Sequence, residues 1–136
     1  MIARVVLNLL SNSIKFSKEN SSIYVDLIVH NDTTEIVVKD EGIGIAKEKQ
    51  KIIFEKFVQV DKSFTRKTEG SGIGLSIVKN IVDIHGGKIK VESKLDEGTT
   101  FRVFLPNIKD DNDDLVLYYV DSYKVQLELS DIYEVI

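Results

Sequence analysis

The chain has 136 residues, 43% of them hydrophobic, with one proline and no cysteine, so it is long enough to form one hydrophobic core and has neither a disulfide framework nor a thiolate metal site. Its 18 Lys and Arg and 22 Asp and Glu give a net charge of -4, which is not the basic footprint of a nucleic-acid-binding domain. The longest apolar run, residues 115–120, is far shorter than the roughly 20 residues of a membrane-spanning helix, and no signal peptide follows Met1, so we expect a cytoplasmic location.

Apolar residues at helical spacing begin the chain. Val5 and Leu9 fall on one side of a helix that we expect over residues 3–17. Alternating apolar residues on both sides of a polar turn then predict a β-hairpin over residues 22–40.

A further helix and hairpin complete the first 106 residues. Helical spacing up to Ile84, followed by Gly86 and Gly87 where a left-handed C-cap is favoured, predicts a helix. Alternation over residues 88–106 predicts the hairpin. We therefore expect an α+β fold, a two-layer sandwich in which about three helices cover one face of a mixed, mostly antiparallel sheet.

Three polar residues share one side of the first predicted helix. Asn8, Asn12 and Lys15 stand at positions i, i+4 and i+7, so their side chains project in one stripe. Two amides and an ammonium group suit a phosphate and metal platform. The alternative is an ordinary solvated helix face, although asparagine is a mediocre helix former.

An acidic residue ends the first predicted hairpin. Asp40 has the strand parity of Ile36 and Val38, so its carboxylate faces the core and needs a hydrogen-bond donor. Gly42 and Gly44 follow, and glycine lets a backbone approach a flat ligand closely. The alternative is a strand followed by a flexible turn.

A glycine-rich stretch, Gly70–Leu75, opens the third of the expected helices, the one that runs up to Ile84. Free backbone N–H groups at a helix start form a site for phosphates. No buried strand precedes this stretch and no Gly-Lys-Ser/Thr occurs in it, which excludes a Rossmann fingerprint and a P-loop. The polar segment 58–71 before the helix has the length of a mobile lid.

Four stretches have the order and spacing of a known family. Residues 8–16 (NLLSNSIKF), 40–45 (DEGIGI), 53–57 (IFEKF) and 70–75 (GSGIGL) resemble the N, G1, F and G2 boxes of the catalytic ATP-binding domain of sensor histidine kinases. The sequences HGG at 85–87 and EGTTF at 97–101 are also typical of it. The resemblance covers residues 1–106, and the wider superfamily includes gyrase B and the Hsp90 chaperones.

The resemblance implies ATP and Mg²⁺ as cofactors and assigns the residues around them. Asn12 would coordinate Mg²⁺, Lys15 would meet the phosphates, and Asp40 would accept the exocyclic amine of adenine, which would be its missing donor. Asn8, Asn12 and Lys15 would be the catalytic residues. The remaining residues implied for the nucleotide site are Phe16, Gly42, Gly44, Ile45, Phe54, Phe57, Lys62, Arg66, Gly70, Gly72, Gly74, Leu75 and Thr99. For Phe54 and Phe57, which would pack under the lid, the alternative is two core aromatics.

Asn8 separates the kinases from the hydrolases of the superfamily. Hydrolysing relatives carry a glutamate at this position, whereas an amide cannot accept a proton from water. The nucleophile would be a histidine of a separate dimerisation domain, in cis or in trans, and a response regulator receiver domain would be a further partner. His30 and His85 are explained as a turn residue and a helix cap, so we expect no autophosphorylation by this chain alone. The alternative function is a nucleotide-dependent interaction module without phosphotransfer.

The last 30 residues form the second part of the chain. Residues 107–114 are acidic and predict a linker, and residues 115–136 predict a strand and helix. They resemble the start of a receiver domain, with Asp121 where an acidic metal site would begin, or they form a tail that docks on the first domain. Because no strand leads into the first helix, we expect a fragment or a minimal kinase with one sheet edge unpaired.

Overall fold

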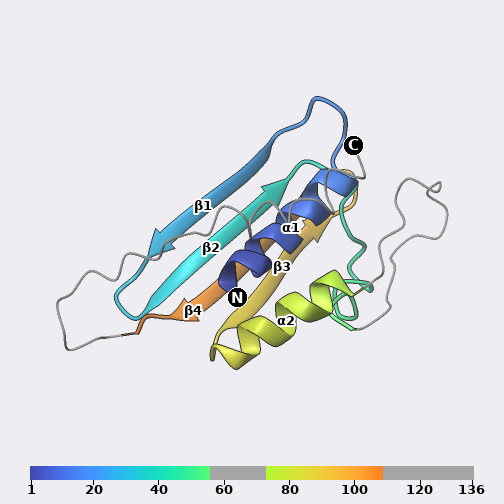
Figure 1. Ribbon diagram of the computed structural model, residues 1–136. Coiled ribbons are helices and arrows are strands. Elements are labelled where there is room, and N and C mark those ends of the chain that lie inside the picture. Colours follow the sequence, from blue (N-terminus) through green and yellow to red (C-terminus); the bar gives the residue numbers. More distant parts are fainter. Residues whose placement is uncertain (56–72, 109–136) are drawn as a thin grey trace.

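The structure is a computed structural model that describes residues 1–55 and 73–108. Two helices and four strands follow one another in these residues (Figure 1). In chain order they are α1 (Ile2–Phe16), β1 (Ile23–Val29), β2 (Thr33–Asp40), α2 (Gly74–Ile84), β3 (Lys88–Lys94) and β4 (Gly98–Pro106).

The strands form one sheet in the order β1-β2-β4-β3. Each of the three pairings in the described residues is antiparallel. The central pair, β2 with β4, joins segments that lie far apart in the sequence, and its register sets Asp40 opposite Thr99. Asp40, at the end of the first hairpin, and Thr99, just after the turn of the second, therefore become direct neighbours.

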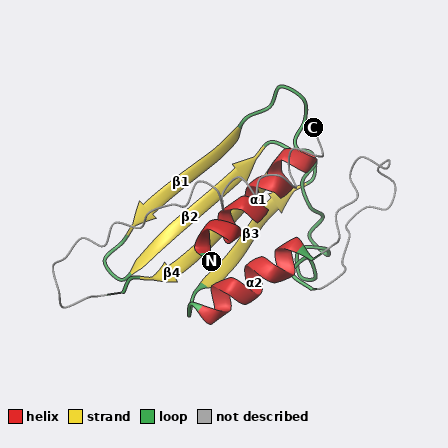
Figure 2. Cartoon of the chain, viewed as in Figure 1, coloured by secondary structure: helices red, strands yellow, loops and turns green. Residues whose placement is uncertain are grey.

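Both helices cover the same face of the sheet, as Figure 2 shows. Val5 and Leu9 of α1 are fully buried, as are Val38 of β2 and Val103 of β4. Burial of an aliphatic side chain contributes about 1.5–3 kcal/mol, so this layer of apolar contacts fixes α1 over the two central strands. No helix among the described residues is long and apolar enough to cross a membrane.

The predicted fold class is confirmed. The first helix was expected at residues 3–17 and begins one residue earlier, and both hairpins agree with the expected ranges to within one residue. Gly86 has φ +69° and ends α2 as its C-cap prediction required. Of about three expected helices, the described part contains two, because residues 46–55 form successive turns closed by bonds such as Gln50 N–H to Ala46 O and Ile53 N–H to Lys49 O.

The first strand lies at an edge of the sheet and is poorly covered. On the side that faces the helices, Val25, Leu27 and Val29 are 49%, 67% and 71% exposed. Within the described residues β1 pairs only with β2. At the other edge of the described sheet, β3 pairs only with β4, so the expectation that a missing leading strand leaves one edge unpaired stays a prediction.

The opposite face of the sheet carries an ion-pair cluster. Glu35 is buried between Arg102 and His30, with Arg102 Nη1 2.7 Å and His30 Nε2 3.2 Å from its carboxylate oxygens. These hydrogen bonds, from Arg102 first and then from His30, lower the pKa of Glu35 below its ordinary value. The cluster links β2 to β4 on the side away from the helices.

The first residue after β4 is tied to the turn between β1 and β2. The backbone N–H of Asn107 donates to Asp32 O at 2.9 Å, and its side-chain amide donates to His30 O at 2.8 Å. Thr34 Oγ1 donates to Asn107 Oδ1 at 2.7 Å. The start of the predicted linker is therefore held against the hairpin. The rest of the linker and the tail, apart from Ile108, lie outside the described residues.

Candidate functional site

Asp40 is the buried acid at the end of β2. It is 4% exposed, and three groups of the protein donate hydrogen bonds to its carboxylate. Oδ1 accepts from Gly42 N–H at 2.9 Å and from Thr99 N–H at 3.2 Å, and Oδ2 accepts from Ser13 Oγ at 3.1 Å. The donor that the resemblance assigns to a ligand is thus partly replaced, because the fold itself supplies donors to both oxygens.

The carboxylate still has acceptor capacity. An ionised carboxylate offers about four lone-pair positions, and the described residues fill three of them. Oδ2 makes a single hydrogen bond within the described residues, so it can accept one more hydrogen bond. The site fits one external donor at Asp40.

The loop after Asp40 packs tightly on two other segments. A Cβ on Gly42 would collide with the carbonyl oxygen of Phe16, and Ile43 N–H donates to the same oxygen at 3.1 Å. Gly44 has φ +70°, and a Cβ there would collide with the carbonyl of Lys94. The close approach that these glycines permit is therefore to the protein backbone at the end of α1 and at the β3–β4 turn.

A network that sequence reasoning missed holds this loop against β3. Ile45 N–H donates to Ser93 Oγ at 2.7 Å, and Ser93 Oγ lies 2.8 Å from both Gly98 O and Thr99 Oγ1. Gln50 Nε2 donates to the carbonyl oxygens of Ile45 and Ser93 at 2.8 and 2.9 Å. One signal existed: Ser93 has the inward parity of Ile89 and Val91, which is a core-facing position.

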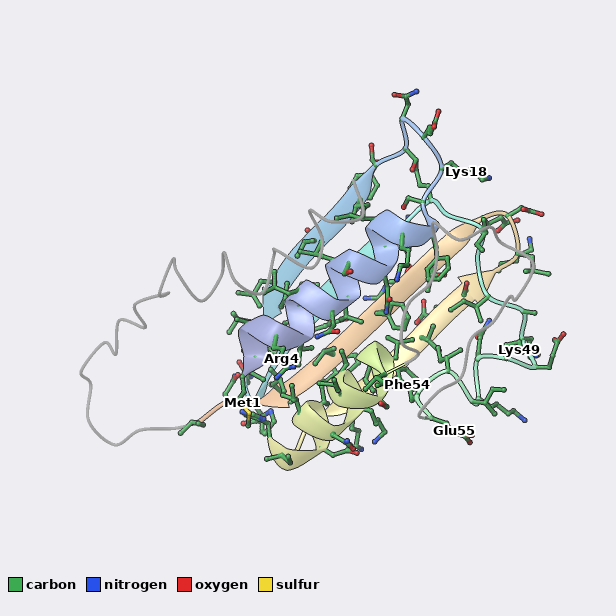
Figure 3. The ribbon with its side chains drawn as sticks, turned by 45° about the vertical axis from the view of Figure 1, so that its right-hand side comes forward. Met1, Arg4, Lys18, Lys49, Phe54 and Glu55 are labelled. Carbon is green, nitrogen blue, oxygen red and sulfur yellow. The ribbon has the colours of Figure 1, made fainter. Side chains whose placement is uncertain are left out.

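The polar stripe of α1 lies beside the start of α2. Asn8 Nδ2 donates to Arg4 O at 2.8 Å, and a Cβ on Gly74 would be 3.0 Å from Asn8 Oδ1. Within the described residues no hydrogen-bond partner meets the Asn12 amide or the Lys15 ammonium, which are both half-buried. Within the described part of the chain, the polar groups of Asn12 and Lys15 therefore have no protein partner. Figure 3 shows α1 running from Met1 and Arg4 at one end to Lys18 just beyond the other.

The start of α2 has no side-chain cap among the described residues. Its N-cap residue, Ile73, makes no side-chain cap hydrogen bond, so the first N–H groups of the helix are not capped by a side chain. Gly74 begins the helix, and Leu75 is partly buried against the core. Phe57, Lys62, Arg66, Gly70 and Gly72, which were also predicted for the site, lie outside the described residues.

The predicted aromatic residues have different environments. Phe54 packs on the core, with its ring centroid 6.3 Å from that of Phe101 in an edge-on arrangement, and lies next to α2 in Figure 3. This contact favours the interpretation of Phe54 as a core aromatic. Phe16, the last residue of α1, is 39% exposed and remains available to a ligand.

The described residues do not by themselves form a complete magnesium site. Among the described residues no three His, Cys, Asp or Glu side chains come together as a metal site. The Asn12 side-chain oxygen is a hard ligand of the kind that Mg²⁺ accepts, and Mg²⁺ usually keeps several waters and shares phosphate oxygens. The donor set therefore fits a metal that arrives with a phosphate group.

Comparison with known proteins points to one family. Residues 1–109 match the family model described as histidine kinase-, DNA gyrase B-, and HSP90-like ATPase. The circadian input-output histidine kinase CikA of Synechococcus elongatus is 37% identical over 105 residues, which are 77% of this chain and 14% of CikA.

Solved structures agree in fold. The mycobacterial sensor histidine kinase MprB has a TM-score of 0.66 and 34% identity, covering 76% of this chain and 68% of that structure. Full-length ShkA in complex with AMPPNP has a TM-score of 0.67 and 29% identity, covering 77% of this chain and 21% of ShkA. The chain thus spans about a seventh of CikA and about a fifth of ShkA.

Proposed function

We propose a function that starts from the family: this chain belongs to the histidine kinase-, DNA gyrase B- and HSP90-like ATPases. Residues 1–106 are the ATP-binding catalytic module of a sensor histidine kinase. The module transfers the γ-phosphate of Mg-ATP to a histidine on a separate dimerisation domain. The phosphoryl group then passes from this histidine to a response regulator receiver domain. The observation that carries the proposal is the Asp40 carboxylate, buried beside Thr99 with one acceptor position open.

Asp40 selects the base by its hydrogen-bonding character. The exocyclic amine of adenine is a donor and matches the open position on Asp40 Oδ2. A guanine presents a carbonyl oxygen at the same place, which a carboxylate repels. The bound AMPPNP of the relative ShkA is an adenine nucleotide, and its binding by that protein supports an adenine site in this one.

The other end of the site receives the phosphates. Lys15 supplies positive charge, and the uncapped N–H groups at the start of α2 favour negative charge near Gly74. Asn12 would hold Mg²⁺, which when bound neutralises charge on the transferring phosphoryl group. The open side chains of Asn12 and Lys15 support this assignment, because nothing in the described residues competes for them.

Asn8 makes water a poor nucleophile in this site. Its amide Nδ2 donates to Arg4 O, and an amide has no basic oxygen to take a proton from water. Both histidines of the chain are engaged elsewhere, His85 Nδ1 with Ile81 O at 2.7 Å and His30 with Glu35. Both also lie away from the site: His85 follows the C-terminal end of α2, about 16 Å along the helix from Gly74, and His30 lies at the opposite end of β2 from Asp40. The proposed phosphate acceptor is therefore a histidine of a partner.

Phosphotransfer to a supplied partner tests the proposal. The chain is incubated with γ-labelled Mg-ATP and a panel of isolated dimerisation domains of sensor histidine kinases. We expect acid-labile label on a histidine of a matched partner, no label with the Asn12→Ala variant, and no label on the chain alone. Binding of Mg-ATP without label on any partner would favour the second candidate, a nucleotide-dependent interaction module. Absence of ATP binding would overturn both.

A further inference from the structure

Ser93 lies at the junction between the loop after Asp40 and the hydroxyl of Thr99. Three polar atoms stand within hydrogen-bond distance of its Oγ: Ile45 N at 2.7 Å, Gly98 O at 2.8 Å and Thr99 Oγ1 at 2.8 Å. A serine hydroxyl has one proton to donate and two lone pairs that accept. The three contacts therefore use its whole hydrogen-bonding capacity.

Only one arrangement of protons satisfies all three contacts. Ile45 N–H can only donate, so it occupies one lone pair of Ser93. Gly98 O can only accept, so it takes the single Ser93 proton. Thr99 must then donate its own hydroxyl proton to the second lone pair of Ser93. The reverse arrangement, with Ser93 donating to Thr99, would leave two oxygens 2.8 Å apart at Gly98 with no proton between them.

The consequence falls on Thr99. With its proton committed to Ser93, Thr99 Oγ1 has only lone pairs to offer to any ligand. Thr99 is 6% exposed, and its backbone N–H already donates to Asp40. The carboxylate of Asp40 also only accepts. The side-chain oxygens of Asp40 and Thr99 thus present acceptors alone to the base.

We propose that Ser93 is a positioning residue that sets base specificity by holding the Thr99 hydroxyl as an acceptor, so that the site admits a purine with an amine at C6 and discriminates against one with a carbonyl there. This inference rests on the proposed function, because it assumes that the base binds at Asp40 and Thr99. It adds a residue that touches no ligand itself and acts through the hydroxyl proton of its neighbour.

Gln50 provides a matched control in the same network. It donates to two backbone carbonyls, those of Ile45 and Ser93, and touches neither hydroxyl. Gln50→Ala therefore loosens the same loop without changing the proton arrangement between Ser93 and Thr99. Ser93→Ala loosens the loop and also frees the Thr99 proton. The two variants separate anchoring of the loop from orientation of the hydroxyl.

The experiment compares ATP with inosine triphosphate, which carries a carbonyl at C6 and lacks the additional amine of guanine. Affinities are measured by competition against a fluorescent ATP analogue with Mg²⁺ present. We expect the wild-type chain to prefer ATP, and Ser93→Ala to reduce the ratio of the two affinities about five-fold, the size of one ordinary hydrogen bond. Gln50→Ala weakens both nucleotides alike and leaves the ratio unchanged, and Ser93→Thr keeps the wild-type ratio.

A double-mutant cycle shows whether the effect passes through Thr99. In a Thr99→Val background there is no hydroxyl to turn, so adding Ser93→Ala should leave the ratio where Thr99→Val put it. An equal loss for both nucleotides in Ser93→Ala would show a structural role alone and overturn the inference. If Ser93→Ala does not fold, as judged by thermal unfolding, the same ratio in Ser93→Cys, whose thiol is a weak donor and acceptor, decides the matter. Wild-type chain that binds neither nucleotide would instead contradict the proposed function.

Discussion

The base end and the phosphate end of the candidate site differ in how much hydrogen bonding the protein supplies. At the base end, Asp40 accepts three hydrogen bonds from the protein, and Ser93 and Gln50 lock the adjacent loop. At the phosphate end, the Asn12 and Lys15 side chains have no hydrogen-bond partner within the described residues. Within the described residues the base end is therefore organised without a ligand, whereas the phosphate end is not. Variants at the two ends should separate effects on folding from effects on binding.

Gly44→Ala should cause the largest loss, because it breaks the base end at its backbone. The new Cβ would meet a left-handed φ of +70° and the backbone of Lys94. We expect a loss of about 3 kcal/mol in the free energy of unfolding, from strain and overpacking together, and loss of ATP binding. Chemical denaturation and calorimetric titration measure the two effects.

Gly86→Ala is the matched control for that variant. Its φ is nearly the same, +69°, but the nearest atom to an added Cβ is Pro106 Cγ at 3.8 Å. It should lose only about 1 kcal/mol from the left-handed conformation and bind ATP normally. Equal effects of the two variants would show that the contact between the loop and the β3–β4 turn has no role.

Asp40→Asn should reduce ATP affinity about 100-fold, which is within the range expected when a hydrogen bond to a charged group is lost. The amide keeps one oxygen for the Gly42 and Thr99 N–H groups, so the variant should stay folded. Calorimetric titration measures the affinity and thermal unfolding checks the fold. An unchanged affinity would remove Asp40 from the base site.

Asn12→Ala, in contrast to Gly44→Ala, should weaken ATP binding and leave the free energy of unfolding almost unchanged. Because Asn12 makes no hydrogen bond to the described residues, the free energy of unfolding should change by less than about 0.5 kcal/mol. ATP affinity in Mg²⁺ should fall about ten-fold, and most of the difference between titrations with Mg²⁺ and with a chelator should vanish. A Mg²⁺ effect as large as in the wild type would place the metal elsewhere.

A substitution in the Glu35 cluster should have the smallest effect on stability and binding. It serves as a reference because the cluster lies away from both the base end and the phosphate end of the site. Because Arg102 and His30 lower the pKa of Glu35 from its ordinary value of 4.5, the unfolded chain binds more protons just below pH 4.5. The stabilisation from Glu35 is therefore present above pH 4.5 and is lost as the pH falls through the lowered pKa. Glu35→Gln should flatten the acid limb of stability against pH and leave ATP affinity at pH 7 unchanged. An acid limb identical to the wild type would show that Glu35 adds nothing to folding.

The sequence predicted the elements of the fold because their patterns are local. Strict alternation marked both hairpins, and the inward parity of Asp40 was visible from Ile36 and Val38. The donors to Asp40 were not predictable, because Thr99 reaches it only through the register of β2 with β4. Residues 46–55 lack a local signal that separates a short helix from the successive turns found there.

The same limit applies to the site. The stripe of Asn8, Asn12 and Lys15 follows from helical spacing alone. Ser93 and Gln50 lie 43 residues apart in the chain and meet through a backbone contact. Neither matched the motif that identified the family, and only the parity of Ser93 marked it as a polar residue on a core-facing side. Motif reasoning finds groups that touch the ligand more readily than groups that orient them.

The attachment of Asn107 to the β1–β2 turn has a practical consequence for handling this protein. The register places Pro106 opposite Thr33 and Thr99 opposite Asp40, so the two ends of β4 are about 24 Å apart at 3.4 Å per residue. Any tether introduced just after Asn107 would start at the tip of the β1–β2 hairpin, remote from the proposed nucleotide site. Immobilising the domain through that point, on a sensor chip or a bead, should leave its binding face open to solution.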